Sequence, residues 1–417
     1  MNPFRFSTVL SILLAGSTAL SQGLSGLKPG EWFEAPDSHL EAVKPDPLPN
    51  GSITAVMAAW SGGSYDSKRD KLIVWGGGHS DYAGNEVYAF DVNSLKWQRL
   101  SEPSTDVGGI ESSGEYPDGT PRSRHTYDYV QYVPVIDRFC TFGGGGLYPS
   151  GQTGTAKTHC FDPAAAKWER KADAIGAGTG SLTAVDPATG MVWMQGAGSD
   201  VRFSSWDPGA DKWTQYSTYS QGWLDYSLTA AIGGDKFLAI GGGHALLWNV
   251  ENPDRQPVEP AMKGDTGILA VNCPGLAYDP VRGRFAAWAG GKDIYYLDPS
   301  TWTWTKEGPA PGNTVIPTTA EKNGTYGRFR YIPSRDLFIG VNRTNEDVFI
   351  FRPSQATGIV PRESGGRLMT SSYSTGIARD LYGGYLWRMS GPGTARGLDG
   401  RRLKASLVIG PRQSPGP

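Results

Sequence analysis

Net charge, histidine and long apolar runs are all scarce in this sequence. Lys and Arg (39) nearly balance Asp and Glu (41), so the formal net charge is −2 over 417 residues. Binding to DNA or RNA depends on a basic surface that neutralises phosphates, and this composition therefore gives no reason to expect a nucleic-acid partner. The one apolar run near the N-terminus, Val9 to Leu20, is too short to span a bilayer.

The first residues have the pattern of an export signal. Arg5 supplies a positive charge ahead of the run of apolar and small residues, and Ala19-Leu20-Ser21 is a small-x-small cleavage pattern. We predict a signal peptide over residues 1–21 and a mature protein that is secreted or periplasmic. A buried N-terminal helix is the alternative.

Glycine, proline and aromatic residues are plentiful. The 57 Gly and 30 Pro, with 11% aromatic residues, favour short strands joined by many turns. One module recurs: a strand, a glycine cluster, a second strand that ends in Asp, and a Trp six residues after that Asp. Four copies keep this spacing: Asp91/Trp97, Asp162/Trp168, Asp207/Trp213 and Asp298/Trp304. Two further copies, Phe237 to Trp248 and Leu337 to Phe351, have each lost one part of it.

Repeats of this length predict a closed array of similar units. Residues 28–353 resemble the kelch repeat, whose signature is a double glycine, an aromatic-rich strand and a spaced Trp. The resemblance is specific to the repeat and to no activity. It implies an all-β, kelch-type β-propeller with six four-stranded blades, closed by an N-terminal strand around Gly30 to Phe33. Residues 354–417 form a basic, Gly/Pro-rich extension, and a degenerate seventh blade there is the alternative, with strand character at Tyr373 to Ala378 and Tyr385 to Met389.

The three cysteines are Cys140, Cys160 and Cys273, so at least one lies outside any disulfide within the chain. Cys140 and Cys160 fall on neighbouring predicted strands of one blade, where a cross-strand disulfide and two small buried side chains both fit. No CxxC motif or Cys/His cluster is present, so no metal site is predicted. No cofactor is required, and a structural divalent metal is left undecided.

Candidate site residues are the irregular ones on one face of the predicted ring. Loops from every blade converge there, and binding sites on rigid scaffolds usually form on such loops. The loop after the first glycine cluster contributes His79, Asp81, Tyr82, Asn85 and Glu86. Other candidates enter the first strand of a blade or follow a later glycine cluster: Trp60, Arg124, His125, His244, Tyr326 and Arg328.

These residue types match the needs of a polysaccharide lyase. Abstracting a proton beside a uronate carboxylate needs a cation, a base and an acid. The predicted catalytic residues are His79, His125, Tyr82, Tyr326, Arg124 and Arg328, and the predicted substrate-binding residues are Asp81, Asn85, Glu86, His244 and Trp60. The chain is similar in fold type and residue types to secreted propeller lyases such as the ulvan lyases, without a position-by-position match.

Other functions are open. Hydrolysis by Asp81 and Glu86 is a weaker option. Galactose oxidase is also a kelch-type propeller, but its adjacent Tyr-His pair is absent and the cysteines do not obviously map to the rim, so a copper oxidase is not expected. The rim residues can also be structural: the histidines as loop caps, the arginines as braces on backbone carbonyls and the tyrosines as packing. The chain would then be a non-catalytic module that binds a glycan or a protein, with rim aromatics such as Trp60 and Trp223 stacking on sugars.

Overall fold

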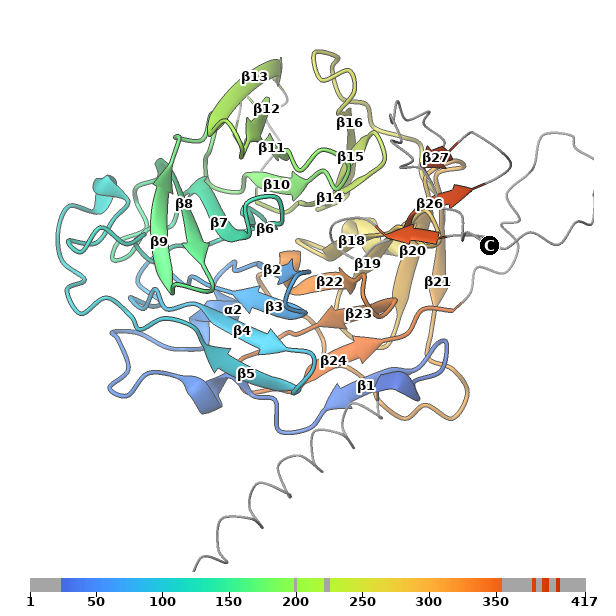
Figure 1. The fold of residues 1–417 in the computed structure, drawn as a ribbon, viewed down its shortest axis with the longest axis horizontal. Coiled ribbons are helices and arrows are strands. Elements are labelled where there is room, and N and C mark those ends of the chain that lie inside the picture. The colour runs from blue at the N-terminus through green and yellow to red at the C-terminus, as the bar shows by residue number, and fades with distance from the viewer. Residues whose placement is uncertain are drawn as a thin grey trace, which may run out of the picture. The chain divides into compact units, whose positions relative to one another are not determined.

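The computed structural model describes residues 24–198, 201–220 and 226–354, together with the short strands 377–379, 385–389 and 395–397. Residues 24–354 contain six antiparallel blades arranged as a β-propeller (Figure 1). The predicted fold class is confirmed. The predicted signal peptide and Trp223 lie outside the described residues.

Each blade is built in the order that the repeat predicts. The strands of blades 1 to 3 are β2 (Gly63–Asp66), β3 (Lys71–Val74), β4 (Tyr88–Asp91), β5 (Lys96–Arg99); β6 (Val130–Val133), β7 (Arg138–Gly144), β8 (Thr155–Asp162), β9 (Lys167–Lys171); and β10 (Leu182–Val185), β11 (Val192–Gln195), β12 (Val201–Asp207), β13 (Lys212–Tyr219). Those of blades 4 to 6 are β14 (Thr229–Gly233), β15 (Lys236–Gly241), β16 (His244–Asn249); β18 (Gly275–Asp279), β19 (Arg284–Trp288), β20 (Ile294–Asp298), β21 (Thr303–Glu307); and β22 (Phe329–Ile332), β23 (Leu337–Gly340), β24 (Val348–Phe351), β1 (Trp32–Ala35).

Two blades depart from the simple pattern. In blade 4 the fourth position is held by a single bridge between Leu247 and Val258. Blade 5 gains β17 (Lys263–Gly264), which runs parallel to β21. Short helical turns lie between the strands: η2 (Leu40–Val43), α2 (Ala55–Ala58), η3 (Glu111–Ser113), η4 (Thr266–Ala270) and η5 (Tyr326–Arg328).

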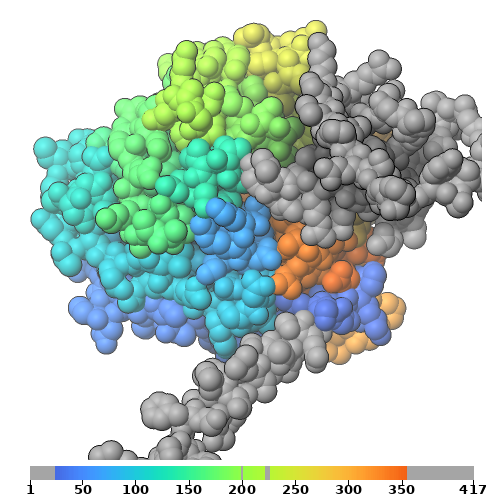
Figure 2. Space-filling model, in the orientation of Figure 1, coloured from blue at the N-terminus to red at the C-terminus, as the bar shows by residue number. Residues whose placement is uncertain are grey.

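The first strand of each blade faces the centre of the ring. These inner strands contact one another in chain order, and β22 of blade 6 contacts β2 of blade 1. Figure 2 shows the consecutive segments as neighbouring coloured sectors. Apolar side chains fill the space between blades, as where Leu72 and Phe90 of blade 1 share a cluster with Ile339 and Ile350 of blade 6. Six blades therefore close the ring without a seventh.

The N-terminal strand completes blade 6 as predicted. Strand β1 pairs antiparallel with β24, with Trp32 opposite Phe351, and Figure 1 shows the two strands side by side. The Trp32 side chain is 1% exposed, and its indole Nε1 donates to the carbonyl oxygen of Lys292 at 2.8 Å. The two ends of the propeller domain thus share one sheet.

The recurrent Asp is structural, as the repeat predicts. In blade 1 the Asp91 carboxylate accepts the backbone N–H of Asn93 at 2.8 Å and so closes the turn before β5. Asp162, Asp207 and Asp298 make the same bond in their blades. In blade 4, Asn249 takes this role and accepts the N–H of Glu251 at 2.9 Å.

The hairpins between the first and second strands carry ion pairs that join blades. Arg69 of blade 1 lies 2.6 Å from Asp137 of blade 2, and Arg282 of blade 5 lies 2.7 Å from Asp336 of blade 6. The predicted hairpins are confirmed. Each hairpin follows the end of an inner strand, and the connecting segment from the previous blade precedes its start. The hairpins and these segments therefore lie at opposite ends of the inner strands.

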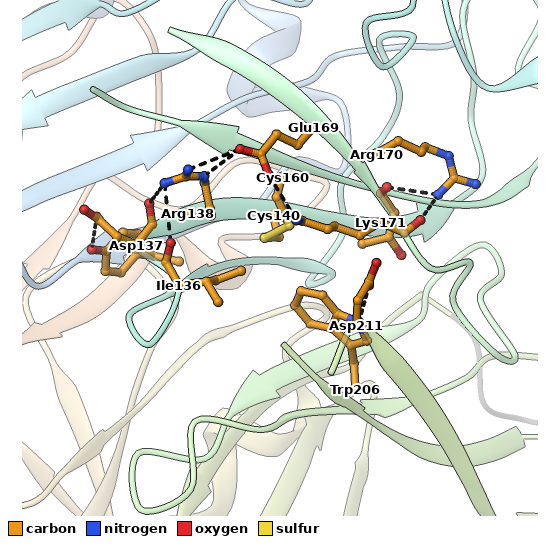
Figure 3. The surroundings of a disulfide bond; sticks show 12 residues. Ile136, Asp137, Arg138, Cys140, Cys160, Glu169, Arg170, Lys171, Trp206 and Asp211 are labelled. Atoms are coloured by element: carbon orange, nitrogen blue, oxygen red, sulfur yellow. Dashed lines mark hydrogen bonds and ion pairs between the residues drawn. A yellow bond between two sulfur atoms is a disulfide. The ribbon is translucent and has the colours of Figure 1, made fainter. Parts of the chain in front are cut away.

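A disulfide joins Cys140 on β7 to Cys160 on β8 (Figure 3). The two residues are directly opposite in the strand register, and both are fully buried. Arg138 and Glu169, drawn beside the bond, form an ion pair at 3.1 Å. The structure decides between the two alternatives left by the sequence in favour of the cross-link.

Removing this disulfide with the pair Cys140→Ala and Cys160→Ala is expected to lower the free energy of unfolding by about 3 kcal/mol, because the bond closes a loop of 20 residues in the unfolded chain. Urea unfolding followed by circular dichroism measures the change. A reductant should shift the midpoint of the wild type and leave that of the double variant unchanged. Equal stability of the two proteins would contradict the prediction.

The C-terminal part contains a small antiparallel sheet of three strands, β25 (Ile377–Arg379), β26 (Tyr385–Met389) and β27 (Ala395–Gly397). Strand β26 has the predicted bounds, and β25 overlaps the end of the other predicted strand. The chain end falls outside the described residues. None of the helices in the part of the chain that the structure describes is long and apolar enough to cross a membrane.

Candidate functional site

Segments that lead into the inner strands meet on the predicted face of the ring. Backbone hydrogen bonds tie these segments together across blades: Tyr127 N–H donates to the Trp60 carbonyl at 2.6 Å, and Cys273 N–H donates to the Ser227 carbonyl at 2.7 Å. Six side chains from blades 1, 2 and 4 gather here, which we call the axial cluster: Trp60, His79, Asp81, His125, Tyr127 and Tyr226.

His125 is the centre of the axial cluster. Its ring lies between the Trp60 ring, at a centroid distance of 5.0 Å, and the His79 ring, which stacks on it at 5.6 Å. Its Nε2 is 3.1 Å from an Asp81 carboxylate oxygen, and its Nδ1 is 3.4 Å from the Tyr127 hydroxyl. With a carboxylate as acceptor, we assign the proton to Nε2, which leaves Nδ1 to accept from the tyrosine.

The imidazole of His125 is neutral at pH 7. It is 5% exposed, and burial lowers its pKa, although the Asp81 carboxylate acts in the opposite direction. Both ring nitrogens already have partners within the cluster, so the imidazole could exchange a proton with a bound molecule only by releasing one of them.

His79 is held by the loops of two blades. Its backbone adopts a positive φ of 46°, and its N–H donates to the Gly146 carbonyl at 2.8 Å. Its Nδ1 is 3.0 Å from the Ser80 hydroxyl. The ring lies so close to Gly151 that a Cβ there would be 1.7 Å from the imidazole. A glycine at 151 is therefore required for the His79–His125 stack.

The axial cluster opens to solvent at two places. The Asp81 side chain is 42% exposed, and Tyr226 is 45% exposed. Between them, the partly exposed Trp60 meets Tyr226 edge-on at 6.2 Å. The surface thus offers a carboxylate at one end of a row of aromatic and imidazole rings.

No protein-family model matches this chain, and no curated protein matches its sequence.

The rest of the first loop lies beneath the surface. Tyr82 is fully buried, and its hydroxyl donates to a Glu86 carboxylate oxygen at 2.6 Å, as does that of Tyr88. Burial raises the pKa of Glu86 despite these two bonds. The Asn85 amide donates to the Thr120 hydroxyl at 2.8 Å. The side chains of Tyr82, Asn85 and Glu86 therefore form hydrogen bonds that stabilise the loop.

Arg124 and Arg328 are fully buried braces. Arg124 donates to the carbonyl oxygens of Arg122, Gly143 and Gly114, and Arg328 donates to those of Val341, Ser61 and Gly324. Burial lowers the pKa of each arginine to about 10, so both keep their charge at neutral pH. Each guanidinium thus holds several loop carbonyls in place.

Tyr326 lies under the axial cluster beside Cys273. The Tyr326 hydroxyl donates to the Tyr226 carbonyl at 2.8 Å and is 2.9 Å from the Cys273 sulfur. Tyr326 is fully buried, and burial raises its pKa. The sequence did not make it obvious that a cysteine lies in this region, but Cys273 directly precedes the inner strand of blade 5.

Tyr127 and Tyr226 were missed from the sequence, although both precede an inner strand at the position that Trp60 and Tyr326 hold in their blades. Comparing these entry segments across blades would have found them. His244 begins β16 of blade 4 opposite Gly241 and is partly buried, and we do not include it in the axial cluster.

Two cavities of about 510 and 490 Å³ lie elsewhere, one between blades 1 and 2 and one at blade 5. Neither is lined by a residue of the axial cluster, which is an open surface. Within residues 24–354, as far as they are described, no group of three or more His, Cys, Asp or Glu side chains is arranged to hold a metal ion.

Proposed function

We propose that this protein is a secreted, kelch-type propeller that binds a carbohydrate at the axial cluster. The observation that carries the proposal is the exposed Asp81 carboxylate beside the rings of His79, His125 and Trp60. Sugar rings present an apolar face that packs on aromatic rings and hydroxyl groups that donate to carboxylates. The cluster supplies both kinds of contact from a rigid scaffold.

Two features support the location in this proposal. The N-terminal residues have the pattern of a signal peptide. The buried disulfide between Cys140 and Cys160 is of the kind that persists in oxidising compartments. The glycine turns and the Asp-capped turns that recur in blades 1, 2, 3 and 5 support the kelch assignment in the same way.

Asp81→Asn and Trp60→Ala are expected to weaken glycan binding at least tenfold, because the first removes the charged acceptor and the second the stacking surface. Isothermal titration of a panel of neutral and acidic hexasaccharides measures the dissociation constants. Asp254→Asn, an exposed carboxylate in blade 4, is the matched control and should bind as the wild type does. A panel that shows no binding to the wild type would reject the proposal and favour a protein ligand.

A lyase acting on uronate polysaccharide is the second candidate, and the Asp81–His125 pair favours it. A neutral, carboxylate-oriented imidazole is suited to act as a base. However, Arg124 and Arg328, which the sequence offered for neutralising the uronate carboxylate, are engaged with backbone carbonyls. Binding without chemistry is therefore better supported. Hydrolysis by Asp81 and Glu86 loses its support because Glu86 is buried under Tyr82.

Absorbance in the unsaturated-uronate band separates these candidates. A rise with acidic polysaccharides that is lost in His125→Gln would establish the lyase, and flat traces with retained glycan binding would leave the binding function alone.

A further inference from the structure

One repeat tryptophan differs from its counterparts. Those in the outer strands of blades 1, 3, 5 and 6 are buried, with exposures of 5%, 7%, 1% and 1% for Trp97, Trp213, Trp304 and Trp32. Trp168 of blade 2 contacts Trp75 and Phe161 at 5.4 and 5.2 Å but stays partly exposed. The tryptophan at this repeat position is buried in those four blades. We therefore expect its partial exposure in blade 2 to have a local structural cause.

The cause is a groove of about 510 Å³ between blades 1 and 2, with Trp168 in its lining. One wall is formed by Arg99 to Glu102, at and after the end of β5. Another is formed by Asp118 to Thr120, within the connection from β5 to β6, which spans residues 100–129 and is the longest between two blades. This long connection thus supplies part of the hollow beside Trp168.

The charges that line the groove balance. Arg99 and Lys167 are positive, while Glu102 and Asp118 are negative, and Arg99 pairs with Glu102 at 3.0 Å. Asp118 accepts the Thr120 N–H and hydroxyl at 2.9 and 2.7 Å, and although burial acts in the opposite direction, these bonds lower its pKa. Asp118 is therefore ionised at neutral pH. Lys167, another lining residue, is exposed.

We propose that this groove is a second carbohydrate site, selective for an uncharged sugar chain. An indole surface for a sugar ring, flanked by carboxylate acceptors and ammonium and guanidinium donors, matches the alternating apolar faces and hydroxyl groups of such a chain. A lining with two charges of each sign gives no net attraction to a polyanion. The volume falls within the range of small-molecule sites. The inference stands on contacts separate from those of the axial cluster.

The test uses the mature protein with cellohexaose, xylohexaose and mannohexaose as neutral probes and hexagalacturonate as the acidic one. The groove variant combines Lys167→Ala with Asp118→Asn, which leaves Trp168 in place and so spares the packing between blades. The matched control combines Lys212→Ala, the same repeat position in blade 3, with Asp254→Asn. Both are also made in the Asp81→Asn background, where the axial cluster is disabled.

We expect at least one neutral hexasaccharide to bind the Asp81→Asn protein, and the groove variant to weaken that binding at least tenfold while the control has no effect. Loss of all binding in Asp81→Asn would overturn the groove site and leave the axial site standing. Full binding in Asp81→Asn that the groove variant abolishes would support the groove and reject the axial site. Tighter binding of hexagalacturonate than of every neutral probe to the Asp81→Asn protein would overturn the assigned ligand class. An absence of any binding to the wild-type protein would overturn both sites.

Discussion

Trp32→Ala is expected to lower the free energy of unfolding by about 4 kcal/mol, the usual cost of truncating a fully buried tryptophan. Trp32 is 1% exposed, and its ring lies 4.8 Å from that of Phe351 and 5.7 Å from that of Trp288. The variant also removes the indole bond to the Lys292 carbonyl. These contacts hold the N-terminal strand β1 against β24, the last strand of the propeller. Losing them should therefore weaken the closure of the ring.

Chemical unfolding followed by circular dichroism measures this effect. Glu34→Ala, at an exposed residue of the same strand, is the control and should change stability by less than about 0.5 kcal/mol. If the two variants were equally stable, the strand around Trp32 would contribute little to holding the ring closed.

Arg328→Met is expected to destabilise the protein by about 4 kcal/mol. The guanidinium is fully buried and donates to three carbonyl oxygens. They belong to Val341 at 3.2 Å, to Gly324 at 2.7 Å, and to Ser61. Removing it leaves three buried acceptors without a donor, at about 1–3 kcal/mol each, partly offset by the apolar replacement. Arg328→Lys should also be destabilised, because a single ammonium group cannot reproduce the planar fork.

Urea unfolding and glycan titration of the same samples separate a brace from a functional group. Arg343→Met, which removes a partly exposed arginine paired with Glu321 and Glu346, is the control and should cost less than about 1 kcal/mol. An Arg328→Met protein that kept wild-type stability but lost binding or activity would return Arg328 to the functional site.

The repeat could be predicted from the sequence because its hydrogen bonds join residues that are close together in the chain. Asp91 reaches only two residues ahead to close its turn, and the spacing to Trp97 is that of one turn and one strand. Such patterns need no knowledge of distant contacts. The closing strand was predictable for the same reason, since Trp32 repeats a pattern whose partner strands were missing at the other end of the chain.

The candidate site was only partly predictable because residue type does not reveal burial. His79, Asp81, His125 and Trp60 do lie together in the axial cluster. Arg124 is adjacent to His125, and Arg328 precedes the inner strand of blade 6, yet their side chains turn inward to backbone carbonyls, among them those of Gly143 and Ser61. For Arg328, the Ser61 carbonyl comes from a segment 267 residues away in the chain.

The disulfide and the groove depend on long-range placement in the same way. Cys140 and Cys160 are 20 residues apart, and only the register between β7 and β8 puts them opposite one another. Cys273 and Tyr326 are brought together by two neighbouring blades. The groove beside Trp168 exists because residues 100–129 fold back between blades 1 and 2.

From the residues alone follow the all-β class, the number of repeats, the turn chemistry and the means of closing the ring, since each rests on spacing over one or two strands. Only the folded chain shows that Asp81 and His125 pair within the axial cluster. Tyr82, Glu86 and the two arginines are instead buried in the interior. The physical reason is that buried polar groups must find partners, and in a ring of blades most of those partners come from another blade.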